Sequence, residues 1–151
     1  MERITFGCYN GKPLQWIPVY KENDGTYILS EPIAKAPFDS SINWYRDADI
    51  RKFIINEFVP NAFTAEQQSM LIPNDEVFGD LAWLADYFEV NSLTKVNHEI
   101  FKYRNRWWMR GHSEANNFSP ATNGVFWFGG LKGEAAKSWP CGIRPCIKIR
   151  L

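Results

Sequence analysis

The residues with the clearest chemical potential lie in the last third of the chain. His112 and Glu114 are two positions apart and carry side chains that could exchange protons with a substrate. Cys141 and Cys146 are five positions apart and could hold a soft metal or form a redox pair. Neither pair brings a third partner with it, and the chain has no phosphate-binding loop, zinc-ligand spacing or nucleophile elbow. The pattern therefore favours a non-catalytic protein.

Binding explains the same region better. Two apolar, strand-like segments, Trp107–Met109 and Ile143–Leu151, which we call the frame, enclose a polar tract that is interrupted by the aromatic run Val125–Phe128. Such a tract cannot bury enough apolar surface to fold alone. Irregular loops held on a rigid support are where binding residues commonly lie. The sequence thus predicts a binding surface that the rest of the chain supports.

The bulk composition fits one globular domain, residues 1–151. The hydrophobic share of 45% allows a core without disulfides. The formal net charge of +0 gives no electrostatic reason to bind nucleic acid or an anionic membrane. No apolar run approaches the roughly 20 residues of a membrane span, and the N-terminus lacks the apolar core of a signal peptide. A cytoplasmic protein is the default expectation, with a phage particle or the cell surface as alternatives.

The first thirty residues predict a β-meander. Alternating apolar residues indicate three strands: Arg3–Tyr9, Leu14–Tyr20 and Thr26–Ser30. Asn10-Gly11 tolerates positive φ and predicts a tight hairpin between the first two. Trp16 is expected on the buried face of the second strand, where Pro18 indicates an edge position or a bulge.

The middle of the chain predicts short helices. Asp47 could cap a helix whose apolar residues follow helical spacing and which ends at Pro60. Thr64 and Gln67 have the spacing of a capping box and predict a second helix. A further apolar stripe predicts a third helix from Asp80 to about Phe88.

Strand-like segments return in the last third, in the frame and in the aromatic run between its two segments. In the last segment, isoleucines alternate with Lys148 and Arg150, so one face is expected to be solvated. Strands on either side of a helical middle, with no βαβ rhythm, predict an α+β fold with antiparallel pairing.

Four motifs resemble a known family. Phe6–Trp16 fits the pattern FGxYxGxPLxW, and Ile42–Thr64 is similar to a W-x-x-S-x-I-R-x-W-L-N-x-x-F pattern. WWMR at Trp107–Arg110 looks like WWLR, and GIRPCI at Gly142–Ile147 looks like a GVRPA ending. Over nearly its whole length the chain therefore resembles the C-type-lectin-fold variable proteins of diversity-generating retroelements, a family of phage and bacterial domains.

The resemblance implies a C-type-lectin-like fold, with small antiparallel sheets, two or three flanking short helices, and paired N- and C-terminal strands. It also implies that the tract between WWLR and GVRP is a variable, solvent-facing surface that binds an unknown protein or surface ligand without a cofactor. Gly111 and Cys146 stand where the family has Ser and Ala, and neither change disturbs the frame. Carried over position by position, the variable residues, which we call the contact set, are His112, Ser113, Glu114, Asn116, Asn117, Phe118, Asn123, Phe126, Phe128, Lys132, Glu134, Lys137 and Trp139.

Two other activities of related folds match less well. Sugar-binding lectins hold calcium through an EPN- or QPD-like loop and a later Trp-Asn-Asp, neither of which occurs here, and the tract offers only Glu114 and Glu134 as carboxylates. Formylglycine-generating oxidases have a cysteine pair spaced like Cys141 and Cys146, but on a regular strand these sulfurs would face opposite sides. Small buried apolar residues are the commoner role for the chain's three cysteines. A metal- or thiol-dependent oxidoreductase and a self-associating phage protein stay as alternatives.

The residues that support the surface can be predicted too. Trp107 and Trp108 are adjacent on a strand and point to opposite faces, so one belongs to the core. The other is expected to pack under a loop, with a ligand platform as the alternative. Arg110 and Arg144 are expected to brace the frame by donating hydrogen bonds to loop carbonyls.

The aromatic run adds candidate hot spots. If Val125 and Trp127 face the core, then Phe126 and Phe128 face outward, beside the polar loops. Exposed aromatic side chains often dominate binding energy. The alternative is that a neighbouring loop covers both phenylalanines.

Overall fold

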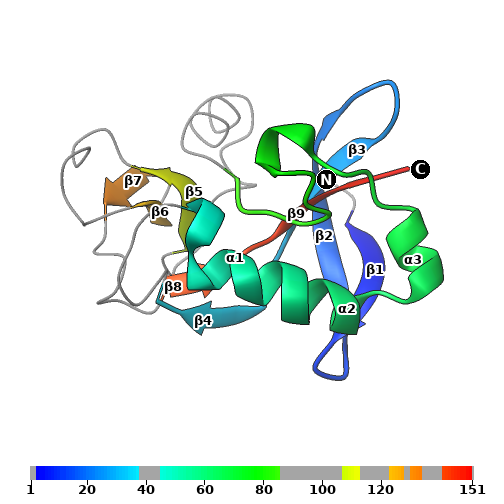
Figure 1. Cartoon of the computed structure of the whole chain (residues 1–151), viewed down its shortest axis with the longest axis horizontal. Coiled ribbons are helices and arrows are strands. Elements are labelled where there is room, and N and C mark those ends of the chain that lie inside the picture. The colour runs from blue at the N-terminus through cyan, green and yellow to red at the C-terminus, as the bar shows by residue number, and fades with distance from the viewer. Residues whose placement is uncertain are drawn as a thin grey trace.

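The computed structural model describes residues 3–37, 45–85, 107–112, 123–127, 130–133 and 141–150. Its strands are β1 (Ile4–Tyr9), β2 (Lys12–Lys21), β3 (Thr26–Ser30), β4 (Ala34–Ala36), β5 (Trp108–His112), β6 (Asn123–Trp127), β7 (Gly130–Gly133), β8 (Cys141–Ile143) and β9 (Cys146–Ile149). Its helical elements are η1 (Tyr45–Asp47), α1 (Asp49–Phe53), η2 (Ile54–Phe58), α2 (Val59–Ala62), α3 (Ala65–Ser69) and η3 (Asp75–Val77). This is the predicted α+β fold, with a curled antiparallel sheet and a few short helices (Figure 1).

The main sheet has the strand order β1-β2-β3-β9 and is antiparallel throughout. Asn10 and Gly11 adopt φ values of 52° and 77°, which confirms the predicted hairpin. Trp16 is fully buried, as expected. Pro18 lies in an inner strand and not at an edge, but the β2–β3 register shifts just after it, so the expected bulge is present.

The last strand pairs with β3 and not with β1. Ile147 lies opposite Ile28, whereas β1 stands at the far edge of the same sheet. The expected pairing of the N- and C-terminal strands is therefore wrong in detail. The tight hairpin holds β1 against β2, and the free edge of β3 is the one that accepts β9.

The expected solvated face of β9 is also wrong at Lys148, which is only 7% exposed. The outer edge of β9 is covered by the chain around Leu71 and Trp83, each of which bridges to it. Ile72 donates its backbone N–H to the Lys148 carbonyl at 2.8 Å. Arg150, beyond the strand, is exposed.

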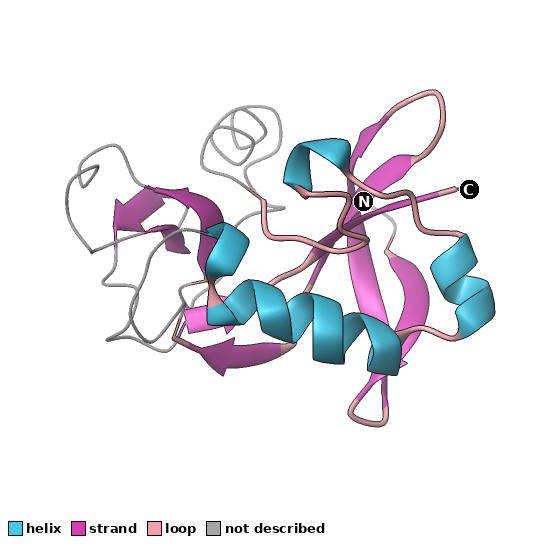
Figure 2. Cartoon of the chain, viewed as in Figure 1, coloured by secondary structure: helices cyan, strands magenta, loops and turns pink. Residues whose placement is uncertain are grey.

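The elements α1, η2 and α2 form one continuous helix from Asp49 to Ala62 (Figure 2). Ile50, Ile54 and Phe58 are buried along one side of it, which confirms the predicted apolar stripe. Its C-terminal part lies against β1. Tyr9 packs its ring against the edge of Phe58, with the ring centroids 5.3 Å apart.

Both predicted ends of this helix need correction. Asp47 belongs to the 3-10 turn η1, and the N-cap is Ala48, which makes no side-chain cap. Pro60 does not end the helix, because the wide π turns of η2 come just before it and place it in the first turn of α2, where its missing N–H is tolerated. Asn61 then donates its side-chain amide to the Glu57 carbonyl at 2.6 Å.

The capping box at Thr64 and Gln67 is present in both directions and starts α3. The third predicted helix is wrong over Asp80–Ala85, where the chain is irregular. Trp83 exchanges two backbone hydrogen bonds with Cys146, of 3.0 and 2.6 Å, so this segment pairs with the start of β9. Residues 86–88 of that prediction lie outside the described residues. No helix in the described ranges is long and apolar enough to cross a bilayer.

Candidate functional site

The two sides of the polar tract meet in the structure. Trp107 and Gly142 form a parallel bridge, so the chain leaves the core at β5 and returns beside the same point at β8. β8 in turn pairs with β4, where Ala34 lies opposite Ile143. Residues 113–140 are therefore bounded on both sides by neighbouring, anchored backbone.

Both tryptophans of the frame belong to the core. Trp107 and Trp108 each have 0% of their surface exposed, which rules out a ligand platform at either. The indole N–H of Trp108 donates to the Ala36 carbonyl at 2.7 Å and so ties β5 to β4. Trp107 and Trp108 are both core residues, because other parts of the chain cover both faces of this strand.

The two arginines brace the frame as predicted. Arg110 donates from Nη1 to the Leu84 carbonyl at 2.8 Å, and its backbone N–H donates to the Ala85 carbonyl at the same distance. Arg144 is fully buried and donates from Nε to the Ser30 carbonyl at 2.9 Å. These contacts fasten one end of the tract to the segment at Leu84 and Ala85 and the other end to the last residue of β3.

Part of the contact set lies on a second, three-stranded sheet with the order β5-β6-β7, at the end of the molecule opposite the main sheet (Figure 1). His112 lies opposite Asn123, and Lys132 lies opposite Val125. Phe126 lies opposite Leu131 in the same ladder. The backbone therefore brings four positions of the contact set into one small sheet, and whether they form one binding surface stays a prediction.

The strand predicted over Val125–Phe128 is confirmed over Val125–Trp127 as β6, which begins two residues earlier; Phe128 lies outside the described residues. The directions of the Phe126 and Phe128 side chains stay a prediction. The other members of the contact set lie outside the described residues: Ser113, Glu114, Asn116, Asn117, Phe118, Phe128, Glu134, Lys137 and Trp139.

The cysteines divide into two kinds. Cys141 in β8 and Cys146 in β9 are buried thiols outside any disulfide, as expected of small core residues. Cys8 in β1 is exposed, which corrects the expectation that all three are buried. Within the described ranges, no three His, Cys, Asp or Glu side chains gather closely enough to hold a metal ion.

An ionic cluster holds the β2–β3 turn to the last strand. The Lys148 amine lies 2.7 Å from an Asp24 carboxylate oxygen and 3.3 Å from one of Glu22. The hydrogen bond from the Tyr20 hydroxyl, followed by that from Lys148, lowers the pKa of Glu22. The hydrogen bond from Lys148 also lowers the pKa of Asp24. Burial raises the pKa of Tyr27, beside this cluster, to about 12, so its ring stays neutral.

A second ionic contact fixes the loop before the frame. Arg51 donates to both carboxylate oxygens of Asp80, at 2.8 and 2.9 Å, and its guanidinium stacks over the exposed Phe78 ring at 4.6 Å. Burial, with the Asp80 charge added, raises the pKa of the enclosed Tyr45 phenol. Both ionic clusters support structure, and neither is part of the predicted binding surface.

No family model, no curated protein and no solved structure matches this chain. The resemblance to C-type-lectin-fold variable proteins therefore rests on the four sequence motifs. The function has to be argued from the frame and from the chemistry of the tract that it bounds.

Proposed function

We propose that this chain is a non-catalytic binding domain on a C-type-lectin-like scaffold, and that the contact set forms a changeable surface that captures a protein or another surface ligand. The observation that supports this best is the bridge between Trp107 and Gly142. Because of this bridge, the backbone just after the tract lies beside the backbone just before it. The residues between Trp107 and Gly142 can therefore change without moving the core.

The anchoring of the frame is strong enough to carry such a tract. A buried tryptophan removes about 150–250 Å² from water, which corresponds to roughly 4–6 kcal/mol of transfer free energy. Trp107 and Trp108 both make this contribution directly beside the tract. The residues that stabilise the fold here are thus those that match the family motif WWLR, whereas the residues of the contact set are available for recognition.

The polar and aromatic character of the contact set fits protein recognition. Aromatic anchors beside Ser and Asn side chains are typical of surfaces that must adapt to many partners. In the setting that the resemblance implies, a phage particle or a bacterial surface or effector system, such a domain recognises one partner per sequence variant. Diversification by a retroelement would supply the variants.

A display selection tests the proposal. The full chain is shown on yeast with the contact set randomised, and is selected against biotinylated hen lysozyme, an arbitrary folded protein. A matched library randomises the same number of exposed positions on the helical side of the molecule, among them Lys52, Asn56 and Glu57.

Selected clones from the first library should bind lysozyme, and they should lose binding when the contact set is returned to the original residues. The matched library should give no such clones. If both libraries are well displayed and the matched library yields binders as often as the contact-set library, the proposal is contradicted.

A further inference from the structure

The strand β2 extends beyond its partner at one end and leaves a gap. β3 ends at Ser30, opposite Trp16, while β2 continues outward through Gln15 to Lys12. After Ser30 the chain turns toward β8, where Ile33 donates its N–H to the Ile143 carbonyl at 2.9 Å. The segment 31–33 therefore starts beside β2 and then diverges from the β1–β2 hairpin.

Two prolines keep the gap from closing as a ladder. Pro13 on β2 and Pro32 on the facing segment both lack a backbone N–H, so neither can donate across it. The last backbone bond between the two sides runs from the Glu31 N–H to the Gln15 carbonyl, at 3.3 Å. Beyond that bond a cavity of about 290 Å³ opens.

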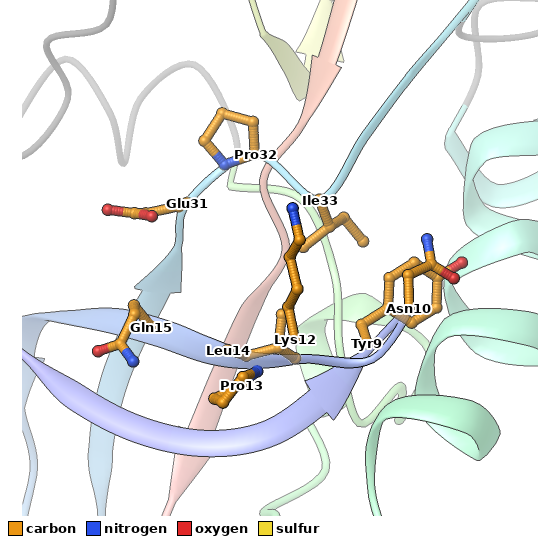
Figure 3. A pocket seen from close by; sticks show the side chains of 9 residues that line it. All are labelled: Tyr9, Asn10, Lys12, Pro13, Leu14, Gln15, Glu31, Pro32 and Ile33. Atoms are coloured by element: carbon orange, nitrogen blue, oxygen red, sulfur yellow. The ribbon is translucent and has the colours of Figure 1, made fainter.

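The cavity has apolar walls and a polar rim (Figure 3). Leu14 is buried, and Tyr9 and Ile33 are half-buried, whereas Lys12 is exposed. The lining residues are Tyr9, Asn10, Lys12, Pro13, Leu14, Gln15, Glu31, Pro32 and Ile33.

The rim carries one positive charge, that of Lys12, which is available to bind an anion. The Glu31 carboxylate is paired with the Arg3 guanidinium. The Lys12 side chain rises from β2 toward Pro32 and Ile33, while the Glu31 carboxylate points to the other side (Figure 3). Among the described residues, no carboxylate forms an ion pair with Lys12.

We infer that this cavity binds a carboxylate attached to a small apolar or aromatic body, with the acid group on Lys12 and the body against Tyr9, Leu14 and Ile33. The volume lies just below the usual range for ligand pockets, about 300–1,000 Å³, and so suits a compact ligand. The hairpin pairing of Lys12 with Tyr9 fixes the backbone from which the lysine side chain rises. The site is independent of the contact set, and either assignment can fail without the other.

Titration of the ¹⁵N-labelled full chain with 3-phenylpropionate, followed by amide NMR shifts, tests the inference. We expect shifts confined to residues 9–15 and 31–33, with a dissociation constant in the millimolar range. The neutral isostere 3-phenylpropanamide should bind about fivefold more weakly, as expected for one partly exposed ion pair. An acetylated tripeptide with a C-terminal phenylalanine carboxylate is titrated in the same way, with the C-terminal amide of the same tripeptide as its control. The comparison with 3-phenylpropionate shows whether the cavity binds a peptide C-terminus or a free small acid more tightly.

Lys12→Met should weaken binding of the acid about fivefold and leave binding of the amide unchanged, and Lys12→Arg should retain both. Lys21→Met, at the opposite end of the same strand, is the matched control and should bind like the original chain. Equal affinity for acid and amide, loss of affinity in the Lys21 variant alone, or no shifts at about 20 mM of either acid would overturn the inference.

Discussion

The guanidinium of Arg144 stacks on the ring of Trp107, with its central carbon 4.7 Å from the ring centroid, and both side chains are fully buried. Trp107 opens the first segment of the frame and Arg144 belongs to the second. Since Arg144 also donates to the Ser30 carbonyl, one side chain joins both sides of the tract to the main sheet. The planar fork of arginine allows it to stack and to donate at once.

Arg144→Lys should therefore destabilise the fold, although the charge is kept. The lysine loses the Nε hydrogen bond and the planar stack, for which we expect a loss of about 2–4 kcal/mol in the free energy of unfolding. Urea denaturation measures it. Arg150→Lys, at an exposed arginine that donates to the Ser69 carbonyl, should change stability by less than about 1 kcal/mol. Equal midpoints for the two variants would show that the buried stack is unimportant.

Two glycines with nearly the same φ angle allow the cost of backbone strain to be separated from the cost of crowding. Gly7 and Gly11 have φ values of 78° and 77°. A Cβ at Gly7 would lie 2.7 Å from the Phe63 ring and 2.9 Å from the Ala62 carbonyl oxygen, whereas at Gly11 it would meet open space. Gly11→Ala should lose about 1 kcal/mol, and Gly7→Ala about 2–4 kcal/mol, in thermal or urea unfolding. A difference smaller than about 0.5 kcal/mol would mean that β1 can move away from the helix.

The Lys148 cluster predicts acid sensitivity. The pKa values of Glu22 and Asp24 are lowered in the folded chain, so their contribution to stability is present above their unfolded values and is lost as the pH falls through the folded ones. Urea midpoints should therefore fall below about pH 4.5. Lys148→Met should make this fall shallower, most of all through Asp24, whose partner is removed.

Lys35→Met, an exposed lysine of β4, is the control for that experiment and should keep the original pH profile. A Lys148→Met variant with the same slope as the original chain would show that the carboxylate pKa values are set elsewhere.

Thiol labelling distinguishes the exposed cysteine from the buried pair. With Ellman's reagent, native protein should react rapidly at Cys8 and only slowly at Cys141 and Cys146, and all three should react in denaturant. Cys8→Ser should remove the rapid phase. Rapid reaction that survives this change would place a reactive thiol near the tract and would revive the oxidoreductase alternative.

Local hydrogen bonds made part of the fold predictable. The Asn10-Gly11 turn and the capping box of Thr64 and Gln67 depend on neighbours within three residues, and both are present. Trp83 shows where such reasoning fails, because its apolar run has helical spacing but its backbone pairs with Cys146, far along the chain. The prediction that Pro60 ends the helix fails for a local reason, since the π turns of η2 just before it accommodate its missing N–H.

The frame of the candidate site was predictable from its residue types, and the cavity was not. Paired tryptophans and arginines beside apolar strands indicated anchored ends for the tract, and their burial and carbonyl contacts agree. The cavity needs β3 to end sooner than β2, a matter of long-range register. Its one sequence signal was the pair Pro13 and Pro32, two residues without a backbone N–H that come to line the same cavity only after folding.

The central claim is that the core holds its structure whatever residues occupy the contact set. The most direct measurement is the melting temperature of a variant in which the residues of the contact set are permuted among their own positions, so that composition is unchanged. We predict a melting temperature within about 5 °C of the original, because exposed substitutions change stability little, and a cooperative transition like that of the original chain. A permuted chain that melts without cooperativity, or that loses as much stability as Trp107→Ala, would contradict the account.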